Sequence, residues 1–181
     1  MNVATTCPEI ETERLKMRWL TEADVPLMLA IWNDPTFVRY VGDRGIRTEQ
    51  QALDELTNNA FRGYEEFGYG PFHVSLRGGG DAIGVCGLYK REHYEDPDIG
   101  FAFLPEYCSQ GYGWEAARAV RDYARDELGL RRIIAIVSPE NTASIRLCEK
   151  LGLGFDRHDT YPDDDETVSV YAIEWDDEVS G

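Results

Sequence analysis

The feature that most constrains the fold is an apolar strand that leads, through a turn with two glycines, into a long amphipathic helix. Residues 98–104 are apolar almost throughout and are followed by Pro105, which predicts a strand in the middle of a sheet. Gly111 and Gly113 lie in the turn, and from residue 113 to 128 apolar side chains recur at helical spacing. The sequence therefore predicts a strand, a glycine turn and a helix in direct succession.

Such a turn is a candidate anion-binding site. The first backbone N–H groups of a helix have no partner within it, and the positive end of the helix dipole adds to their attraction for phosphate. The same glycines are also compatible with a turn that needs them only for its geometry. A dinucleotide fingerprint tolerates Ala116 in place of its third glycine, but it fits poorly because the next strand ends in Ser138 rather than in an acidic residue. No Gly-Lys-Ser/Thr phosphate-binding loop occurs.

The rest of the chain reads as further strands and helices. Strands are expected at residues 14–20, 72–76, 82–89, 133–137, 155–161 and 167–175, and helices at residues 21–32, 49–62 and 141–152. Thr48 is the expected N-cap of the second helix, and Pro35 stops the first. This order predicts an α/β (α+β) fold with a mixed, mostly antiparallel central sheet of about seven strands flanked by about four helices.

Length and composition favour one domain over residues 1–181. No apolar run approaches the roughly 18 residues that a membrane-spanning helix needs, so no membrane association is expected. The N-terminus lacks the basic start and apolar stretch of a secretory signal, and we expect a cytoplasmic protein.

Charge and metal-ligand spacing exclude two classes of partner. The net charge of −16 argues against nucleic-acid binding, which needs clustered Lys and Arg. The four Cys and three His residues are scattered without metal-ligand spacing, so no metal is expected. Between residues 107 and 154, however, basic residues outnumber acidic ones seven to six, and an anionic ligand would meet the least repulsion there.

Four motifs follow one another along the chain, at residues 11–15, 98–100, 109–117 and 140–152. Together they resemble the GNAT superfamily of N-acetyltransferases, and within it most closely the branch that includes the RimJ/RimL-type enzymes, which acetylate ribosomal-protein N-termini. The resemblance covers about residues 10–175 and implies acetyl-CoA as co-substrate and a primary amine as acceptor.

The resemblance also implies positions for the cofactor. In such enzymes the glycine turn binds the CoA pyrophosphate through main-chain amides. The corresponding residues here are Gln110, Gly111, Tyr112, Gly113, Trp114 and Glu115. Phe103 and Leu104 fall where strand amides bind the pantetheine and polarise the thioester. Asn141 matches the asparagine that contacts the pantetheine arm, and it is equally suited to be a helix N-cap.

Three more residues of the last helix correspond to cofactor contacts. Ser144 is either a contact or a small residue that permits close approach. Arg146 or Lys150 is placed to meet the 3′-phosphate of CoA, although exposed helical cations are common.

Amide formation needs a base and an acid. Asp98 aligns with the acidic residue that acts through water in the family, and a neighbouring apolar strand would raise its pKa. The alternative is a solvated residue at the strand edge. Many relatives carry a tyrosine seven residues after the asparagine, where this chain has Cys148, so water or Ser144 becomes the candidate acid. Cys148 itself is either a covalent nucleophile or inert packing.

The acceptor pocket is expected between the loops after the first two helices, and its walls are expected to include Phe37, Tyr40, Tyr69 and Phe72. The alternative is that these aromatic residues belong to the core. The negative charge of the rest of the chain favours a cationic acceptor, such as a polyamine, an aminoglycoside or a basic protein N-terminus. The alternative to an enzyme is a non-catalytic acyl-CoA-binding module. Either a monomer or a homodimer is compatible with the sequence.

Overall fold

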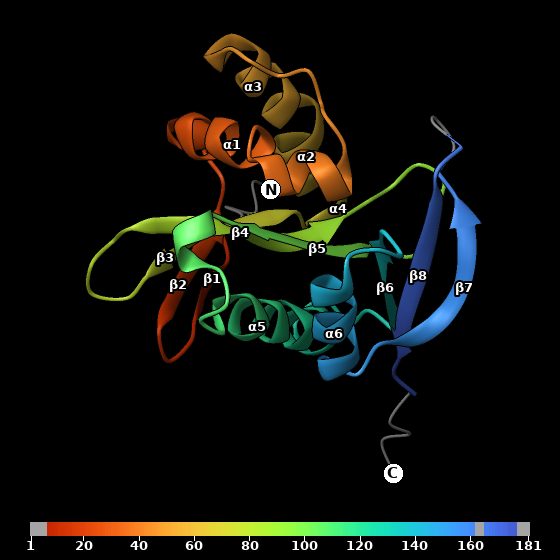
Figure 1. Cartoon of the computed structure of the whole chain (residues 1–181). Helices are drawn as coiled ribbons and strands as arrows, with labels where there is room; N and C mark the ends of the chain where they lie inside the picture. The colour runs from red at the N-terminus through yellow and green to blue at the C-terminus, as the bar shows by residue number, and fades with distance from the viewer. Residues whose placement is uncertain (1–6, 162–164, 177–181) are drawn as a thin grey trace.

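The computed structural model describes residues 7–161 and 165–176, and within them one eight-stranded sheet forms the centre of the molecule (Figure 1). The strands are β1 (Glu9–Glu11), β2 (Leu15–Trp19), β3 (Pro71–Leu76), β4 (Ala82–Tyr89), β5 (Asp98–Phe103), β6 (Arg132–Val137), β7 (Gly154–Thr160) and β8 (Thr167–Glu174). Their order is β1-β2-β3-β4-β5-β6-β8-β7. Every neighbouring pair is antiparallel except β5 and β6, which are parallel.

Helices cover both faces of the sheet (Figure 1). On one face lie α1 (Val25–Trp32), α2 (Pro35–Val41), α3 (Glu49–Leu56) and α4 (Arg62–Phe67), with a π-helical turn joining the last two. On the other lie α5 (Tyr112–Asp126) and α6 (Thr142–Lys150). Among the described residues no helix is long and apolar enough to cross a membrane.

The expected mixed, mostly antiparallel sheet flanked by helices is confirmed, with eight strands and six α-helices in the described residues. Two short elements account for most of the difference in number. The three-residue β1 is too short to give a periodic signal. Pro35 does stop α1, but it also begins α2, because the Asp34 side chain caps that helix by accepting from the amides of Thr36 and Phe37 (2.9 and 3.2 Å).

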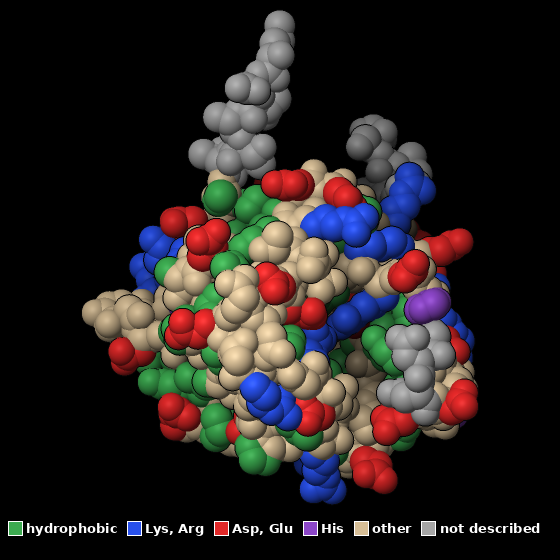
Figure 2. Space-filling model, turned by 90° about the horizontal axis from the view of Figure 1, so that it is seen from above, with side chains coloured by type: hydrophobic (Ala, Val, Ile, Leu, Met, Phe, Trp, Pro, Cys, Tyr) green, Lys and Arg blue, Asp and Glu red, His purple; other side chains and the backbone are tan. Residues whose placement is uncertain are grey.

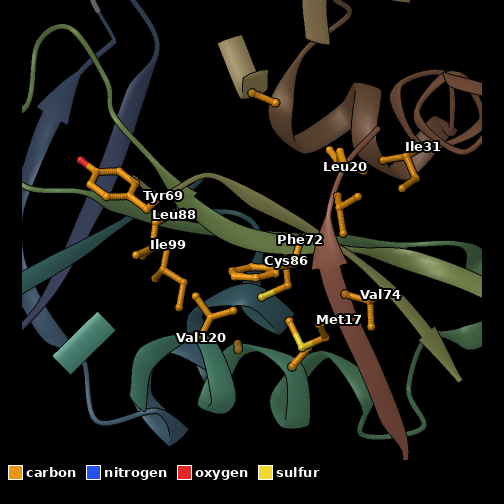
Figure 3. Packing of buried hydrophobic residues seen from close by; sticks show 14 of the residues in the cluster. Met17, Leu20, Ile31, Tyr69, Phe72, Val74, Cys86, Leu88, Ile99 and Val120 are labelled. Carbon is orange, nitrogen blue, oxygen red and sulfur yellow. The ribbon is translucent and has the colours of Figure 1, made fainter. Parts of the chain in front are cut away.

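The buried core extends over both faces of the sheet, and one part of it lies between the sheet and α5. Figure 3 shows Met17, Phe72, Cys86 and Val120 meeting there from three strands and the helix. Val120 is fully buried, and so are the alanines of the same helical face, which lets α5 approach the sheet closely. The strand and the helix that flank the glycine turn are therefore fixed to one rigid core.

Candidate active site

The site begins at a gap between β5 and β6. All six residues of β5 pair with β4, whereas only Asp98 of β5 has a partner in β6, Ile134. Beyond that pair the two strands diverge, and Figure 1 shows β6, β8 and β7 turned steeply away from β4 and β5. One edge of β5 therefore carries backbone groups that no ladder satisfies.

Strand register decides which amides of β5 face this gap. The Leu104 amide donates to the Ile83 carbonyl (2.9 Å), so it points toward β4. Because hydrogen-bonding direction alternates along an antiparallel pair, the amides of Phe101 and Phe103 point the other way, toward the gap. The expectation for Phe103 is compatible with this direction. The expectation for Leu104 is wrong, because its N–H is already bonded, and Phe101 was missed.

Asp98 lies where β5 and β6 begin to diverge, and it is only 4% exposed. Its Oδ1 accepts from the Ile136 amide of β6 (3.2 Å), and its Oδ2 accepts from Arg91 Nε (3.0 Å). The solvated-edge alternative is therefore wrong. Burial raises the pKa of the Asp98 carboxyl, and Arg91 and the Ile136 amide offset this only in part. Arg91 was missed, since nothing in the local pattern marks it.

The glycine turn forms the N-terminus of α5. Gly111 is the N-cap with φ 85°, a left-handed conformation that favours glycine. The Glu115 amide donates to the Gly111 carbonyl (3.1 Å), the first bond of the helix. The amides of Tyr112, Gly113 and Trp114 precede that bond and project from the helix end. Glu115 was expected to offer its amide as well, and that is wrong because the helix uses it.

The Glu115 side chain instead ties the turn to the N-terminal motif. Oε2 pairs with Arg14 Nε at 2.6 Å, and Oε1 accepts from the Thr12 hydroxyl (2.6 Å) and the Arg14 amide (2.8 Å). Arg14 Nη1 also donates to the Gln110 carbonyl (3.0 Å), and its guanidinium lies over the Tyr112 ring at 4.4 Å. The segment 11–15 that marked the resemblance thus positions the turn.

A cavity of about 250 Å³ connects the gap with the helices of the opposite layer. On one side it is lined by Asn141, Ser144 and Cys148 of α6 and its cap, and Asp98 lies on its wall. On the other side it is lined by expected acceptor residues, namely Phe37, Tyr40 and Tyr69. Sequence reasoning missed Arg44, Tyr89, Lys90 and Arg91, which also line it.

Phe72 does not belong to this site. Its side chain is 1% exposed and meets the ring of Tyr123 in α5 edge-on, at 5.7 Å between centroids. It faces the core on the α5 side of the sheet, because strand residues alternate between faces. Its expected acceptor role is therefore wrong, and the alternative of a core residue is correct.

Comparison with known proteins identifies the family. The family model described as the acetyltransferase (GNAT) domain matches residues 14–154. This chain belongs to the GNAT acetyltransferase family. The uncharacterized N-acetyltransferase YnaD of Bacillus subtilis is 33% identical over 80% of this chain and 81% of its own length. YoaA of the same organism, also described as an uncharacterized N-acetyltransferase, is 30% identical over 80% and 82%.

Solved structures agree. A GNAT-family acetyltransferase of Bacillus anthracis is 30% identical, with a TM-score of 0.76 over 92% of this chain and 98% of that one. An acetyltransferase of Agrobacterium tumefaciens is 26% identical, with a TM-score of 0.81 over 97% and 99%. RimL in complex with coenzyme A shares the fold at 15% identity, with a TM-score of 0.78 over 92% and 98%. The chain is accordingly an acetyl-CoA-dependent N-acetyltransferase rather than a non-catalytic module.

In this GNAT enzyme, α6 brings three of the expected residues to the cavity. Asn141 Oδ1 accepts from the Ser144 amide (3.2 Å) and so caps α6, which leaves the Asn141 amide nitrogen for another partner. Cys148 is fully buried, and burial raises the pKa of its thiol to about 12. The thiol is therefore protonated at neutral pH, which disfavours a nucleophilic role.

One further expected residue, Arg146, and its alternative, Lys150, lie away from the cavity. Arg146 is exposed, and the structure gives no contact to it. Lys150, the alternative to Arg146, lies with its ammonium over the Trp114 ring at 4.4 Å. In the described part of the chain no group of three or more His, Cys, Asp or Glu side chains is placed to hold a metal ion.

Proposed function

We propose that this enzyme transfers acetyl directly from acetyl-CoA to a primary amine, with both substrates bound at once on opposite sides of the β5–β6 gap. One observation carries the proposal: a single cavity joins Asn141 and Ser144 on the α6 side to Phe37, Tyr40 and Tyr69 on the side of α1–α4. Two substrates that enter from opposite faces would meet beside Asp98.

The backbone fits acetyl-CoA along its length. The amides of Phe101 and Phe103 would pair with the pantetheine in the gap, as a neighbouring strand would. The projecting amides of Tyr112, Gly113 and Trp114, together with the segment from Gln110, would bind the pyrophosphate. A Cβ on Gly113 would come no closer than 3.6 Å to protein atoms, so packing alone does not require glycine there. Close approach of a ligand accounts for it.

The chemistry uses groups already beside the gap. Acetyl-CoA, when bound, supplies the thioester whose carbonyl carbon the amine attacks. Asp98 accepts the amine proton through water, and its raised pKa suits a base better than an ordinary carboxylate. A gap-facing amide of β5 stabilises charge that develops on the carbonyl oxygen. As the carbon–sulfur bond breaks, the Ser144 hydroxyl or water gives a proton to the sulfur.

The names of two proteins that share the fold indicate the chemical class of the acceptor. RimL is named for the N-terminal amine of ribosomal protein L7/L12, and a Vibrio cholerae neighbour of 19% identity for spermidine. Both are primary-amine acetyltransferases by name. This supports a primary amine as the acceptor here. The lining of the cavity would select the rest of the acceptor molecule.

Initial-rate kinetics test direct transfer. Thiol release from acetyl-CoA is measured against a panel of primary amines, varying both substrates. Intersecting reciprocal plots are expected, as a ternary complex requires. Parallel plots, or an acetyl adduct on Cys148 in the mass spectrum, would show a covalent intermediate instead.

Cys148→Ala provides the matched variant. Because the thiol is buried and protonated, we expect kcat to stay within about threefold of the wild type, together with a modest loss of stability from the small cavity created. A loss of kcat of about 10²-fold or more would assign the thiol a catalytic role. If no amine supports thiol release in the wild type, the proposed function is wrong.

A further inference from the structure

The acceptor side of the cavity has a charge opposite to that of the whole protein. The chain carries 34 acidic and 18 basic residues. Among the charged side chains that line the cavity, however, three are basic (Arg44, Lys90 and Arg91) and only two are acidic (Glu55 and Asp98). The surface that an acceptor meets is therefore not the acidic one that the net charge predicts.

Both carboxylates are already paired. Glu55 Oε1 accepts from Arg44 Nη1 at 2.6 Å, and Asp98 Oδ2 accepts from Arg91 Nε at 3.0 Å. A polyamine acceptor needs carboxylates for its second and third ammonium groups, and here it would have to displace an arginine from each. Among the described residues, the cavity offers no unpaired carboxylate for a polycation.

Of the three basic side chains that line the cavity, Lys90 is the one without a carboxylate partner among the described residues. Its Nζ donates to the carbonyl oxygens of Tyr94 (2.5 Å) and Glu95 (2.7 Å), and no carboxylate of the described residues pairs with it. Two neutral carbonyls orient the ammonium without neutralising it, and a third N–H remains. An ammonium held in this way is suited to an incoming anion.

Two neighbours reinforce this preference. The Arg91 guanidinium lies over the Tyr89 ring, with 5.0 Å between its Cζ and the ring centroid. A second positive charge therefore lies next to Lys90 in the cavity lining. Burial raises the pKa of Tyr89 to about 12, which keeps its hydroxyl a neutral donor. Figure 2 shows Lys and Arg side chains along one wall of the hollow that opens on this face of the molecule.

Lys90 and Arg91 also line a second, outer cleft of about 580 Å³, between α4 and the residues that follow β4. Its charged lining again has three basic and two acidic residues, apart from His93, and Arg62 pairs there with Glu66 at 2.7 Å. Lys90 therefore lines both the outer cleft and the inner cavity, and an acceptor that entered through the outer cleft would pass its ammonium.

We propose that the acceptor is a small primary amine that also carries an anionic group, a carboxylate or a phosphate, and that Lys90 pairs with this group while the amine reaches Asp98. This assignment rests on the proposed function, and it narrows the acceptor from any primary amine to an amino acid or amino phosphate. It departs from the cationic acceptor that the overall charge favoured.

Matched pairs of amines test the assignment on the wild-type enzyme. Glycine and β-alanine are compared with their amides, and phosphoethanolamine with ethanolamine, with spermidine as the polycation. We expect kcat/KM to be at least about tenfold higher for the anionic member of the preferred pair, the effect of one charge-assisted hydrogen bond. The pair that responds tells carboxylate from phosphate. Equal or higher values for the neutral members or for spermidine would overturn the assignment while leaving amine acetylation intact.

Lys90→Gln then locates the preference. It should lower kcat/KM for the anionic member about tenfold, to the level of its neutral partner, and leave the neutral partner and KM for acetyl-CoA unchanged. Lys90→Arg should restore much of the loss. Lys16→Gln is the control, since Lys16 of β2 pairs with Glu9 of β1 (3.2 Å) and does not line the cavity. An equal loss for both members would contradict the role of Lys90, and the matched pairs decide the acceptor class even if Lys90→Gln does not fold.

Discussion

Two buried aspartates are each paired with an arginine, but their pKa values are shifted in opposite directions. Asp24 is 5% exposed and Asp98 is 4% exposed, so burial alone does not separate them. Asp24 accepts two bonds from Arg18 (2.8 and 2.9 Å) and one from the Thr21 amide (2.8 Å). Burial opposes its ionisation, but these donors hold the pKa of Asp24 below its usual value.

Asp98 has fewer donors. It receives one bond from Arg91 and one from Ile136, and burial leaves its pKa raised. The difference is also one of place: Asp24 joins β2 to the start of α1, whereas Asp98 lines the cavity at the gap. A carboxylate with several donors stabilises the fold, whereas one with fewer donors and a raised pKa beside a cavity is suited to exchange a proton.

Removing the charge of Asp98 should have the largest effect. In Asp98→Asn the amide oxygen still accepts from Ile136, but no base remains. We expect kcat/KM for the amine to fall about 10²-fold or more, with KM for acetyl-CoA nearly unchanged. The wild-type rate should decline as pH falls through a pKa above that of an ordinary aspartate, because the base must be ionised, and the variant should lack this decline.

Activity retained by Asp98→Asn would contradict the role of Asp98 as the base. If Asp98→Asn keeps more than about a tenth of the activity, the side chain of Asp98 only joins β5 to β6 through the Ile136 amide, and the base is another group or water. Circular dichroism and KM for acetyl-CoA distinguish this from a collapsed gap, since the gap must stay open for the cofactor to bind.

Asp24→Asn should reverse the pattern, with a loss of stability and no loss of rate. Arg18 would then face a neutral amide, and since its side chain is 35% exposed we expect about 2 kcal/mol in urea denaturation at neutral pH. Because the folded pKa of Asp24 is depressed, its contribution is present above the unfolded pKa and is lost as pH falls, so wild type and variant should converge below about pH 4. A drop in kcat at unchanged stability would place Asp24 in the reaction.

Much of the fold followed from local signals in the sequence. Thr48 caps α3 as expected, with its hydroxyl accepting from the Gln51 amide (3.2 Å). The strand, glycine turn and helix over residues 98–128 form as predicted, because strand apolarity, helical periodicity and glycine are each local. Pro35 shows the limit: it ends one helix and begins another, and the sequence signal for the two is the same.

The site was predictable only in part, because it depends on register and on distant pairs. Which amide faces the gap, Phe101 or Leu104, depends on the alignment of β5 with β4, and a shift of one residue reverses it. Phe72 was misplaced for the same reason. Arg44 lies in the loop after α2 and Arg91 in the loop after β4, and no local pattern indicates that both line one cavity.

The smallest effect is expected at Glu115, a carboxylate that resembles Asp24 in its donors but lies in the first turn of α5, beside the glycine turn that we propose binds the pyrophosphate. Burial disfavours its charge, yet the bonds from Thr12 and Arg14 hold the pKa of Glu115 below its usual value. Glu115→Gln keeps an acceptor oxygen and loses the ion pair with Arg14, so we expect about 1 kcal/mol of lost stability and a KM for acetyl-CoA raised about threefold. The stability difference should be full above pH 5 and vanish as pH falls through the depressed folded pKa. Glu13→Gln, at an exposed neighbour, is the control, and an unchanged KM for acetyl-CoA in Glu115→Gln would mean that the turn keeps its shape without Arg14.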